Sequence, residues 1–450
     1  MALALFAANV YRAATQSFTI DEALTFRLFI SAPFSEAWRM YDPNHHVLLA
    51  LLCRVCLQVF GPSELSMRLP VLLGGAVYLL AALAIVRKLS SNGFLCLASY
   101  ACLTLNPFTL DFLSVSRGYG LALGLFAAGL WFLLQSSTRR FLPAALCFGL
   151  CVAASLVFAI PVAAAIGACG LDALVQRRSL WPVILSLALP AAAISFVILI
   201  VPLLPLERAS LSYGSDTVMV MVDSLVRQSF QHHPWFGYMT MERIDPFTRI
   251  AVVCASLIPL AGALRAAKLP AASRLILFTF SLTLLALFLF HVGTGLRYPY
   301  GRTGIYLPML LLLALTASGA TARAHWDAYA LACVLAVAAI CFACEWNTRL
   351  YGEWAFDAGT KKSLKFLAAE PHANSVPLAC SWYFVETVNY YRLTRRLRWL
   401  EPVDRDGLQR AADYYVLGPE DSGLVSQLKL RVIHKDPVSL QILAVRQRER

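Results

Sequence analysis

Two adjacent carboxylates, Asp21 and Glu22, directly follow the first apolar segment of the chain. Such a pair can do acid–base chemistry, because one carboxylate can accept a proton while the charge of its neighbour shifts the first group's pKa. The same dipeptide also suits the start of a helix, where an acid in the first turn interacts favourably with the helix dipole. On the residues alone, the chemical and the structural interpretation both stand.

Further polar groups that could bind an anionic substrate occur in three later stretches. A guanidinium fork matches phosphate oxygens and keeps its charge beside lipid, although an arginine at a helix end can simply reach to the membrane surface. The histidines could equally be loop residues, and the tyrosines interfacial aromatic residues. The candidates are Asn44, His45, His46, Arg117, Tyr119, Arg297, Tyr298 and Arg302.

The composition defines the class of protein that must position these groups. The chain has 450 residues, of which 59% are hydrophobic and 14% charged. These proportions exclude a soluble globular protein and predict a polytopic membrane protein. The net charge of +12 does not indicate nucleic-acid binding, because the basic residues come as pairs between apolar runs. The twelve cysteines lack a zinc-binding pattern and are interpreted as small buried residues.

Eleven apolar segments are predicted to span the membrane, so the expected fold class is an all-α polytopic membrane bundle. The segment 46–60 is also apolar, but it is short and carries Arg54 and Gln58, which favours a helix lying in the interface. The predicted spans are 1–15, 68–86, 91–109, 117–135, 141–157, 159–175, 181–204, 249–266, 273–291, 303–321 and 327–344.

Pairs of basic residues set the expected orientation, because cytoplasmic loops are enriched in Lys and Arg. Such pairs fall in alternate loops, at 87–88, 139–140 and 177–178. We therefore expect the amino terminus in the cytoplasm and the carboxyl-terminal tail outside it. The long regions 16–67 and 205–248 then lie on the outer side, where loops of this length are usually functional.

The tail from residue 345 is more polar and is predicted to form a small extracytoplasmic α/β domain. The chain thus divides into a membrane domain over 1–344, with its first outer loop at 16–67, and a tail domain over 345–450. Helical patterns occur near 358–369 and 405–412. The predicted strands are Val376 to Trp382, Asp413 to Gly418, Leu428 to His434 and Leu440 to Val445.

Several motifs carry a family resemblance. They are Thr19-Ile-Asp-Glu-Ala-Leu-Thr25, Asn44-His45-His46, Phe60-Gly-Pro-Ser-Glu-Leu-Ser-Met-Arg-Leu-Pro70, Ser114-Val-Ser-Arg117-Gly-Tyr119 and Arg297-Tyr-Pro-Tyr-Gly-Arg302. They resemble motifs of the glycosyltransferase C superfamily, above all the family 39 type, which includes protein O-mannosyltransferases and the aminoarabinose transferase. The second motif departs from the family's N-H-P-P-L turn, and His45 is the preferred match to its histidine.

The resemblance implies an inverting hexosyl or pentosyl transferase. It would move a sugar from a polyprenyl-phosphate carrier to an extracytoplasmic lipid, polysaccharide or protein. Asp21 would be the general base, with Glu22 orienting the acceptor or tuning the pKa. Arg117 and Arg302 would hold the departing phosphate, with Arg297 competing for the role of Arg302. The remaining substrate contacts would come from Asn44, His45, His46, Tyr119 and Tyr298.

The resemblance also implies partners and a location. The partners are the lipid-linked sugar, its acceptor and membrane lipids, and the location is a bacterial inner (plasma) membrane with the active site on the extracytoplasmic face. No cofactor is expected, and a divalent cation between Asp21 and Asp42 or Asp111 is the less favoured alternative. Asp111 is more simply a structural cap. A second histidine pair, His232-His233, suits a loop contact with a headgroup or acceptor.

Two rival interpretations remain. A lipid or sugar transporter or flippase would also show many spans, but transporters place ionisable residues near the membrane midplane of repeated halves. Here the acids cluster in one outer loop, which favours an enzyme. The other rival is an assembly protein that has kept the fold and lost the activity, and the joint presence of Asp21, Glu22, Arg117 and Arg302 argues against it.

Overall fold

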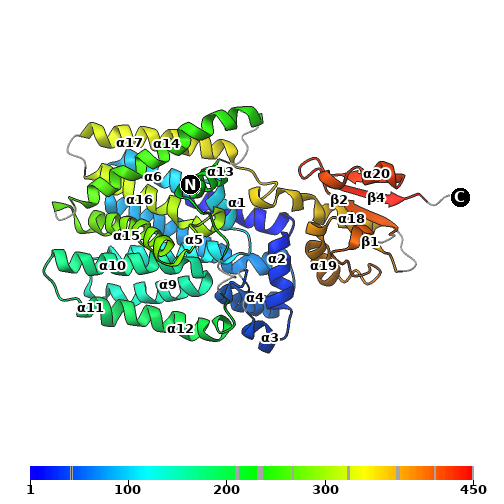
Figure 1. Cartoon of the computed structure of the whole chain (residues 1–450), viewed down its shortest axis with the longest axis horizontal. Coiled ribbons are helices and arrows are strands. Elements are labelled where there is room, and N and C mark those ends of the chain that lie inside the picture. The colour runs from blue at the N-terminus through cyan, green and yellow to red at the C-terminus, as the bar shows by residue number, and fades with distance from the viewer. Residues whose placement is uncertain are drawn as a thin grey trace. The chain divides into compact units, whose positions relative to one another are not determined.

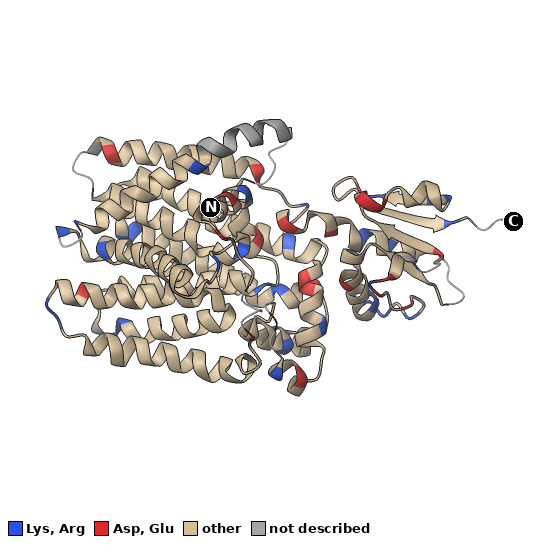
Figure 2. Ribbon diagram, viewed as in Figure 1, with Lys and Arg blue, Asp and Glu red and all other residues tan. Residues whose placement is uncertain are grey.

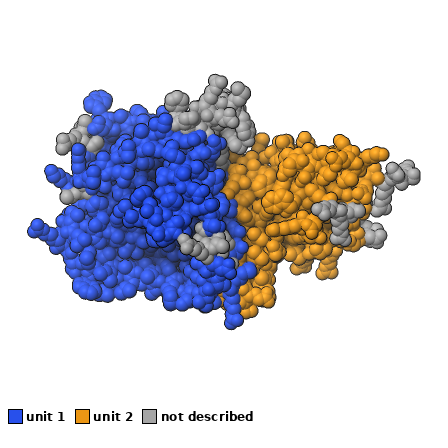
Figure 3. Space-filling view, viewed as in Figure 1, with its two compact units in different colours: residues 1–9, 39–49, 70–346 blue, residues 10–38, 50–69, 347–450 orange. Residues whose placement is uncertain are grey.

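The structure is a computed structural model of the whole chain. It describes all residues except 41, 43, 208–211, 231–236, 266–267, 322–324, 371–374, 410–411 and 448–450, and the side chains of 138, 237–247, 325 and 409. The chain forms two compact units (Figure 3). Unit 1 comprises residues 1–9, 39–49 and 70–346, and unit 2 comprises 10–38, 50–69 and 347–450.

Every predicted membrane segment contains a helix, as the apolar runs of the sequence require. Their bounds are α1 Ala2–Thr15, α5 Glu64–Leu89, α6 Gly93–Leu105, α7 Pro107–Phe112, α8 Gly118–Leu133, α9 Phe141–Ala154, α10 Ala159–Val175, α11 Trp181–Val183, α12 Leu189–Leu203, α14 Gly237–Ala263, α15 Ala271–Thr294, α16 Tyr306–Ala320 and α17 His325–Glu345. Two further helices, α4 Val47–Phe60 and α13 Val218–Ser229, lie outside the predicted membrane segments (Figure 1).

Six stretches in the described part of the chain are long and apolar enough to cross a membrane. They are Glu64–Leu89, Leu156–Val175, Trp181–Leu203, Ala271–Thr294, Gly301–Ala320 and Trp326–Glu345. Shorter apolar helices accompany them, α4, α6, α8 and α9 among them. The charged residues lie mainly at helix ends and in loops (Figure 2). The protein is therefore a multi-pass membrane protein.

Small residues let the helices of unit 1 approach closely. Gly120 and Gly124 lie one turn apart on α8, and a Cβ atom on Gly124 would meet the backbone oxygen of Gly74 on α5. Such spacing is typical of close helix packing in membranes. Asn106 ends α6 and caps α7, with Pro107 in its first turn. These contacts fix the start of α8, where Arg117 is the N-cap residue and Tyr119 lies in the first turn.

Unit 2 combines short helices with a four-stranded sheet. The helices near the chain start are α2 Ile20–Thr25, the π-helical turn η1 Phe26–Ile30 and α3 Phe34–Arg39. The tail contains the 3₁₀ segment η8 Gly352–Gly359 and the helices α18 Thr360–Ala369, α19 Val385–Thr394 and α20 Leu424–Gln427. The strands are β1 Leu378–Cys380, β2 Tyr414–Leu417, β3 Leu430–Lys435 and β4 Ile442–Arg446.

The strand order is β1-β2-β4-β3, with β1 and β2 parallel and the other pairs antiparallel. All four strands fall within or beside the predicted runs, and α18 matches the helical pattern near 358–369. The pattern near 405–412 yields only the short turn η10 Gly407–Gln409, with residues 410–411 outside the description. The helix α19 was not predicted from the sequence.

Candidate active site

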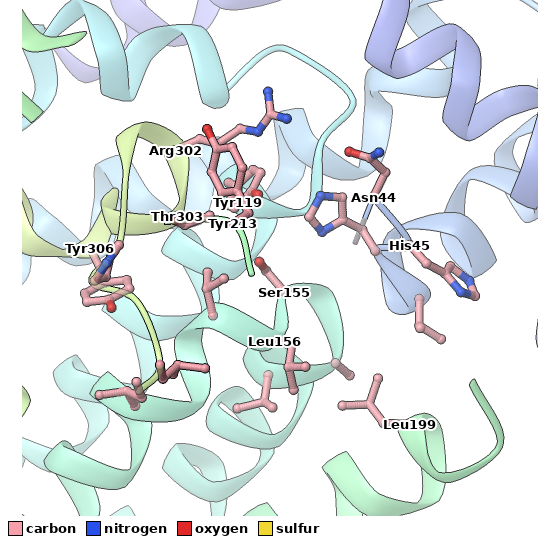
Figure 4. A pocket seen from close by; sticks show the side chains of 18 of the residues that line it. Asn44, His45, Tyr119, Ser155, Leu156, Leu199, Tyr213, Arg302, Thr303 and Tyr306 are labelled. Carbon is pink, nitrogen blue, oxygen red and sulfur yellow. The ribbon is translucent and has the colours of Figure 1, made fainter. Parts of the chain in front are cut away.

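A pocket of about 490 Å³ lies within unit 1. Its walls come from the loop before α4, the starts of α8 and α16, the α9–α10 junction, and the ends of α12 and α15. Arg302 and Asn44 lie at one end of the pocket, while Leu156 and Leu199 lie at the other (Figure 4). The pocket therefore offers a charged polar end and an apolar end to a single ligand.

The polar end contains the expected Asn44-His45-His46 turn. The turn begins with Asp42, whose carboxylate accepts the backbone N–H of Asn44 at 2.7 Å. His45 lines the pocket, and its Nδ1 lies 3.0 Å from the carbonyl oxygen of Met40. Both histidines of the altered turn thus reach the pocket, so neither can be set aside in favour of the other.

His46 is held from several sides. Its ring is buried, meets the edge of the Tyr119 ring at 4.8 Å, and Nδ1 lies 3.2 Å from the carbonyl oxygen of Ala154. Burial lowers the pKa of His46 well below its usual value, and the nearby charges of Arg117 and Arg302 lower that pKa further. The imidazole is therefore neutral, and its Nδ1–H donates to Ala154.

Glycine at position 118 makes this arrangement sterically feasible. A Cβ atom there would collide with the carbonyl oxygen of Ala154 and with the ring of His46. Close packing therefore explains why the central residue of the Arg117-Gly-Tyr119 motif is glycine. It brings the first turn of α8 against the end of α9 and the histidine ring.

Arg117 holds the wall of the pocket rather than lining it. Its side chain is fully buried just before α8, and Nη2 donates to the Oδ1 atom of Asn44 at 2.7 Å. Arg117 is absent from the pocket-lining residues in the described part of the chain. A charge-assisted bond of this kind orients the Asn44 amide strongly.

The late loop supplies two arginines to the pocket. Arg302 lies in the 3₁₀ turn η7 Gly301–Gly304 and is half-buried. Arg297 is more exposed, and its Nε lies 3.1 Å from the carboxylate of Asp216. Two backbone hydrogen bonds of 2.8 Å between Ser215 and Tyr298 fix this loop.

Tyr298 serves the loop and is not among the described residues that line the pocket. Its ring is buried and stacks on His291 with a centroid distance of 4.2 Å. Tyr119, in contrast, lines the pocket. Asp111 is buried in α7, and His232 and His233 lie outside the described residues.

The carboxylate pair belongs to unit 2, where it opens α2. Thr19 caps this helix: its hydroxyl accepts the N–H of Glu22 at 3.3 Å, and its own N–H donates to Glu22 Oε2 at 2.9 Å. Glu22 is buried, whereas Asp21 is partly exposed. The structural interpretation of the dipeptide thus applies to Glu22, and Asp21 has the exposure that contact with a substrate requires.

Arg68 is the partner of Glu22. Its Nε and Nη2 lie 2.8 and 2.6 Å from the two Glu22 carboxylate oxygens. The other N–H groups donate to backbone oxygens of Ala13, Gln16 and Ser17. All five donors of the guanidinium are used, which satisfies a buried charge that would otherwise be costly.

Asp357 is a third carboxylate beside this pair. It is buried, and Oδ2 accepts the N–H of Ile20, the first residue of α2, at 2.7 Å. Burial raises the pKa of Asp357 well above its usual value, and the charges of Asp21 and Glu22 raise it further. Sequence reasoning missed Asp357, because no local motif marks it. Arg68 was part of the motif that ends in Arg-Leu-Pro, but the sequence did not predict its pairing with Glu22.

No group of three or more His, Cys, Asp or Glu residues in the described part of the chain is arranged to hold a metal ion. The polar groups that line the pocket include guanidinium, imidazole, amide and hydroxyl groups. They suit an anion at the polar end of the pocket.

Comparison with known proteins gives a result at the level of fold. No family model matches the sequence, and no curated protein matches it. Among solved structures, ArnT from Cupriavidus metallidurans bound to undecaprenyl phosphate superimposes with a TM-score of 0.53. The identity is 12%, and the match covers 99% of this chain and 97% of ArnT.

This chain shares its fold with ArnT. The apo structure of ArnT gives the same TM-score of 0.53 at 14% identity, over 99% of this chain and 98% of ArnT. ArnT is an aminoarabinose transferase of the glycosyltransferase C superfamily, so the resemblance drawn from the motifs is confirmed as a likeness of fold. An Archaeoglobus fulgidus oligosaccharyltransferase in complex with Zn and sulfate matches with a TM-score of 0.48 and 12% identity, over 93% of this chain and 68% of that one.

Proposed function

We propose that the protein is an inverting glycosyltransferase that uses a polyprenyl-phosphate-linked sugar. The observation that carries the proposal is the pocket with Arg302 and Asn44 at its polar end and leucines at its apolar end. A lipid phosphate has the same two parts, an anionic head and a hydrocarbon chain. The fold of ArnT, whose structure contains undecaprenyl phosphate, supports this choice of donor.

In the proposed reaction, the Asp21 carboxylate takes the proton of an acceptor hydroxyl. The acceptor oxygen forms a bond to the anomeric carbon as the bond from that carbon to the phosphate oxygen breaks. The electron pair leaves with the polyprenyl phosphate, and Arg302 stabilises its charge. The configuration at the anomeric carbon inverts. Glu22, paired with Arg68, keeps α2 in place and does not itself contact the acceptor.

Arg117 has a positioning role in this proposal, because its bond to Asn44 sets the amide that faces the donor. His46 is neutral and donates to a backbone oxygen, so we assign it to the wall of the pocket. The reaction as proposed uses no cofactor, since a carboxylate and a guanidinium supply both the base and the charge stabilisation.

We further propose eleven membrane spans, a membrane domain over 1–344 and an extracytoplasmic domain over 345–450. The pattern of basic loops supports this topology and puts Asp21 on the extracytoplasmic side. A bacterial inner membrane is the proposed location, and a lipid, polysaccharide or protein is the proposed acceptor.

The experiment is mass spectrometry of envelope lipids, polysaccharides and proteins from cells with the chain, without it, and with Asp21→Asn. One sugar should be missing both without the chain and with the Asn variant, whose transfer rate should fall roughly 10²- to 10⁴-fold. Membrane levels of the variant, measured by immunoblot, serve as the folding control. A normal sugar content with Asp21→Asn would contradict the base assignment and leave the transporter as the better explanation.

A further inference from the structure

A second hollow, of about 340 Å³, lies entirely within unit 2. It is bounded by the last turns of α1, the segment 348–349, the start of α18 and Arg395. Its lining includes no acidic residue among those described, but it includes Arg349, Lys361, Lys362, Lys365 and Arg395. So many cations around one hollow repel one another and attract an anion.

Part of this positive charge is already compensated. Glu64 lies 2.9 Å from Lys361 and 3.6 Å from Arg395. The remaining cations, Arg349, Lys362 and Lys365, have no ion-pair partner within the described residues. The hollow therefore has a net positive charge that a phosphate group would partly offset.

A buried amide points to the same ligand chemistry. Gln16 lines the hollow and is only 6% exposed, yet neither atom of its side-chain amide has a hydrogen-bond partner within the described structure. A buried polar group without a partner destabilises the folded state. A ligand oxygen in the hollow would accept from the Gln16 Nε2 group and satisfy this donor.

The walls of the hollow are held in place before any ligand binds. Arg12 donates to the carbonyl oxygen of Leu350 at 3.0 Å, which ties the segment beside Arg349 to α1. The N–H of Lys361 donates to the hydroxyl of Ser17 at 3.3 Å, and its ammonium group donates to the carbonyl oxygens of Ala14 and Thr15. These bonds fix α18 against the end of α1.

We propose that this hollow binds the phosphate of an anionic lipid headgroup. A lipid is favoured over a soluble phosphate because the α1 wall carries Tyr11, which is 56% exposed. Tyrosine is enriched at the headgroup level of membranes, and the first half of α1, ALALFAA, is apolar. The site uses residues of unit 2 only and does not depend on the proposed transferase activity.

The test measures binding of phosphatidic acid to the purified full-length protein in detergent by native mass spectrometry, with phosphatidylcholine as the neutral-headgroup control. Lys362→Gln combined with Lys365→Gln should weaken phosphatidic acid binding roughly tenfold or more. Arg431→Gln combined with Lys435→Gln removes the same charge from exposed positions on β3 outside the hollow and should leave binding unchanged.

Gln16→Met separates a ligand contact from a structural role. Methionine keeps the length of the side chain and removes the unpartnered amide, so the melting temperature should hold or rise while phosphatidic acid binding falls. The proposal would be overturned if the protein bound both lipids equally, or if the two double variants lost phosphatidic acid binding equally. Unchanged phosphatidic acid binding by Gln16→Met would also overturn it. Displacement of phosphatidic acid by inorganic phosphate at equal concentration would overturn the choice of a lipid.

Discussion

Glu22 and Arg68 form a two-point ion pair, in which Nε and Nη2 of the arginine lie 2.8 and 2.6 Å from the two carboxylate oxygens. Both side chains have 0% exposure. The remaining N–H groups of the same guanidinium donate to backbone oxygens around the end of α1. The pair thus links the last turn of α1, the start of α2 and the start of α5.

Breaking this pair should destabilise unit 2. Arg68→Met leaves the buried Glu22 charge without its partner, which typically costs about 3 to 5 kcal/mol. The combined variant Glu22→Gln with Arg68→Met should lose less than the sum of the two single variants, because no unpaired charge remains. Thermal unfolding of the four proteins in detergent measures this coupling. Strictly additive losses would show that the two side chains do not stabilise each other.

The sequence singled out Asp21 and Glu22 as candidate functional residues, but it did not predict that Glu22 is buried and Asp21 partly exposed. Asp21 and Glu22 are chemically alike and adjacent, so no local pattern says which one is buried. The Thr19-x-x-Glu22 capping box is local, but the contacts of Arg68 with Glu22 and of Asp357 with the start of α2 require the folded chain. Contacts between residues so far apart in sequence leave no periodic signal.

Arg302 is expected to contact the phosphate of the donor. Arg302→Ala should weaken binding of undecaprenyl phosphate by about 1.5 to 3 kcal/mol, roughly 10- to 100-fold in Kd, because a charged hydrogen bond is lost. Arg302→Lys should lose less, since it keeps the charge without the fork. Native mass spectrometry of the purified protein gives both values. A larger loss with Arg297→Ala than with Arg302→Ala would transfer the role to Arg297.

Arg117 should act through Asn44 and not on the ligand directly. Arg117→Lys and Asn44→Ala are therefore expected to weaken undecaprenyl phosphate binding by similar amounts, and the double variant should be little worse than either. The same binding measurement decides this. Additive effects of the two substitutions would place the Arg117 guanidinium on the ligand, as the family resemblance implied.

Asp357 should make stability depend on pH in an unusual direction. Burial holds its native pKa well above the unfolded value, so the native state binds its proton more tightly than the unfolded chain does. The stabilisation is complete below about pH 4, the unfolded pKa, and is lost as the pH rises through the native pKa. Relative to Asp357→Asn, the wild-type melting temperature should therefore fall with rising pH. A difference that stays constant with pH would contradict this.

The tail shows both what the sequence predicts and what it does not. The strands are short runs rich in apolar residues, such as LAC in β1 and YYVL in β2, and all four were predicted. The helix α19 was missed because its sequence, VETVNYYRLT, is rich in β-branched and aromatic residues that favour strands. Its conformation is stabilised by burial: the Tyr391 hydroxyl accepts the backbone N–H of Phe18 at 2.8 Å, and Tyr390 stacks on the Phe18 ring.

Membrane orientation can be tested with cysteine labelling, but the structure restricts the choice of positions. Thr360, an obvious choice at the start of the tail, is fully buried, and its hydroxyl accepts a hydrogen bond from Gln441. A cysteine there would not react from either side of the membrane. Ser422 and Ser136 are exposed and lie in the tail and in the loop before α9. The exposed native cysteines to be replaced first by serine are Cys254, Cys333 and Cys344.

In that background, a membrane-impermeant maleimide should label Ser422→Cys in intact cells and Ser136→Cys only after permeabilisation. The reason is that the basic pair at 139–140 should hold its loop in the cytoplasm, while an odd number of spans puts the tail on the other side. Labelling of both positions after permeabilisation shows that each thiol is reactive, so protection in intact cells reports the side of the membrane. The reverse pattern would place the tail in the cytoplasm. Asp21 belongs to the same compact unit as the tail, so the reverse labelling pattern would also contradict an extracytoplasmic reaction.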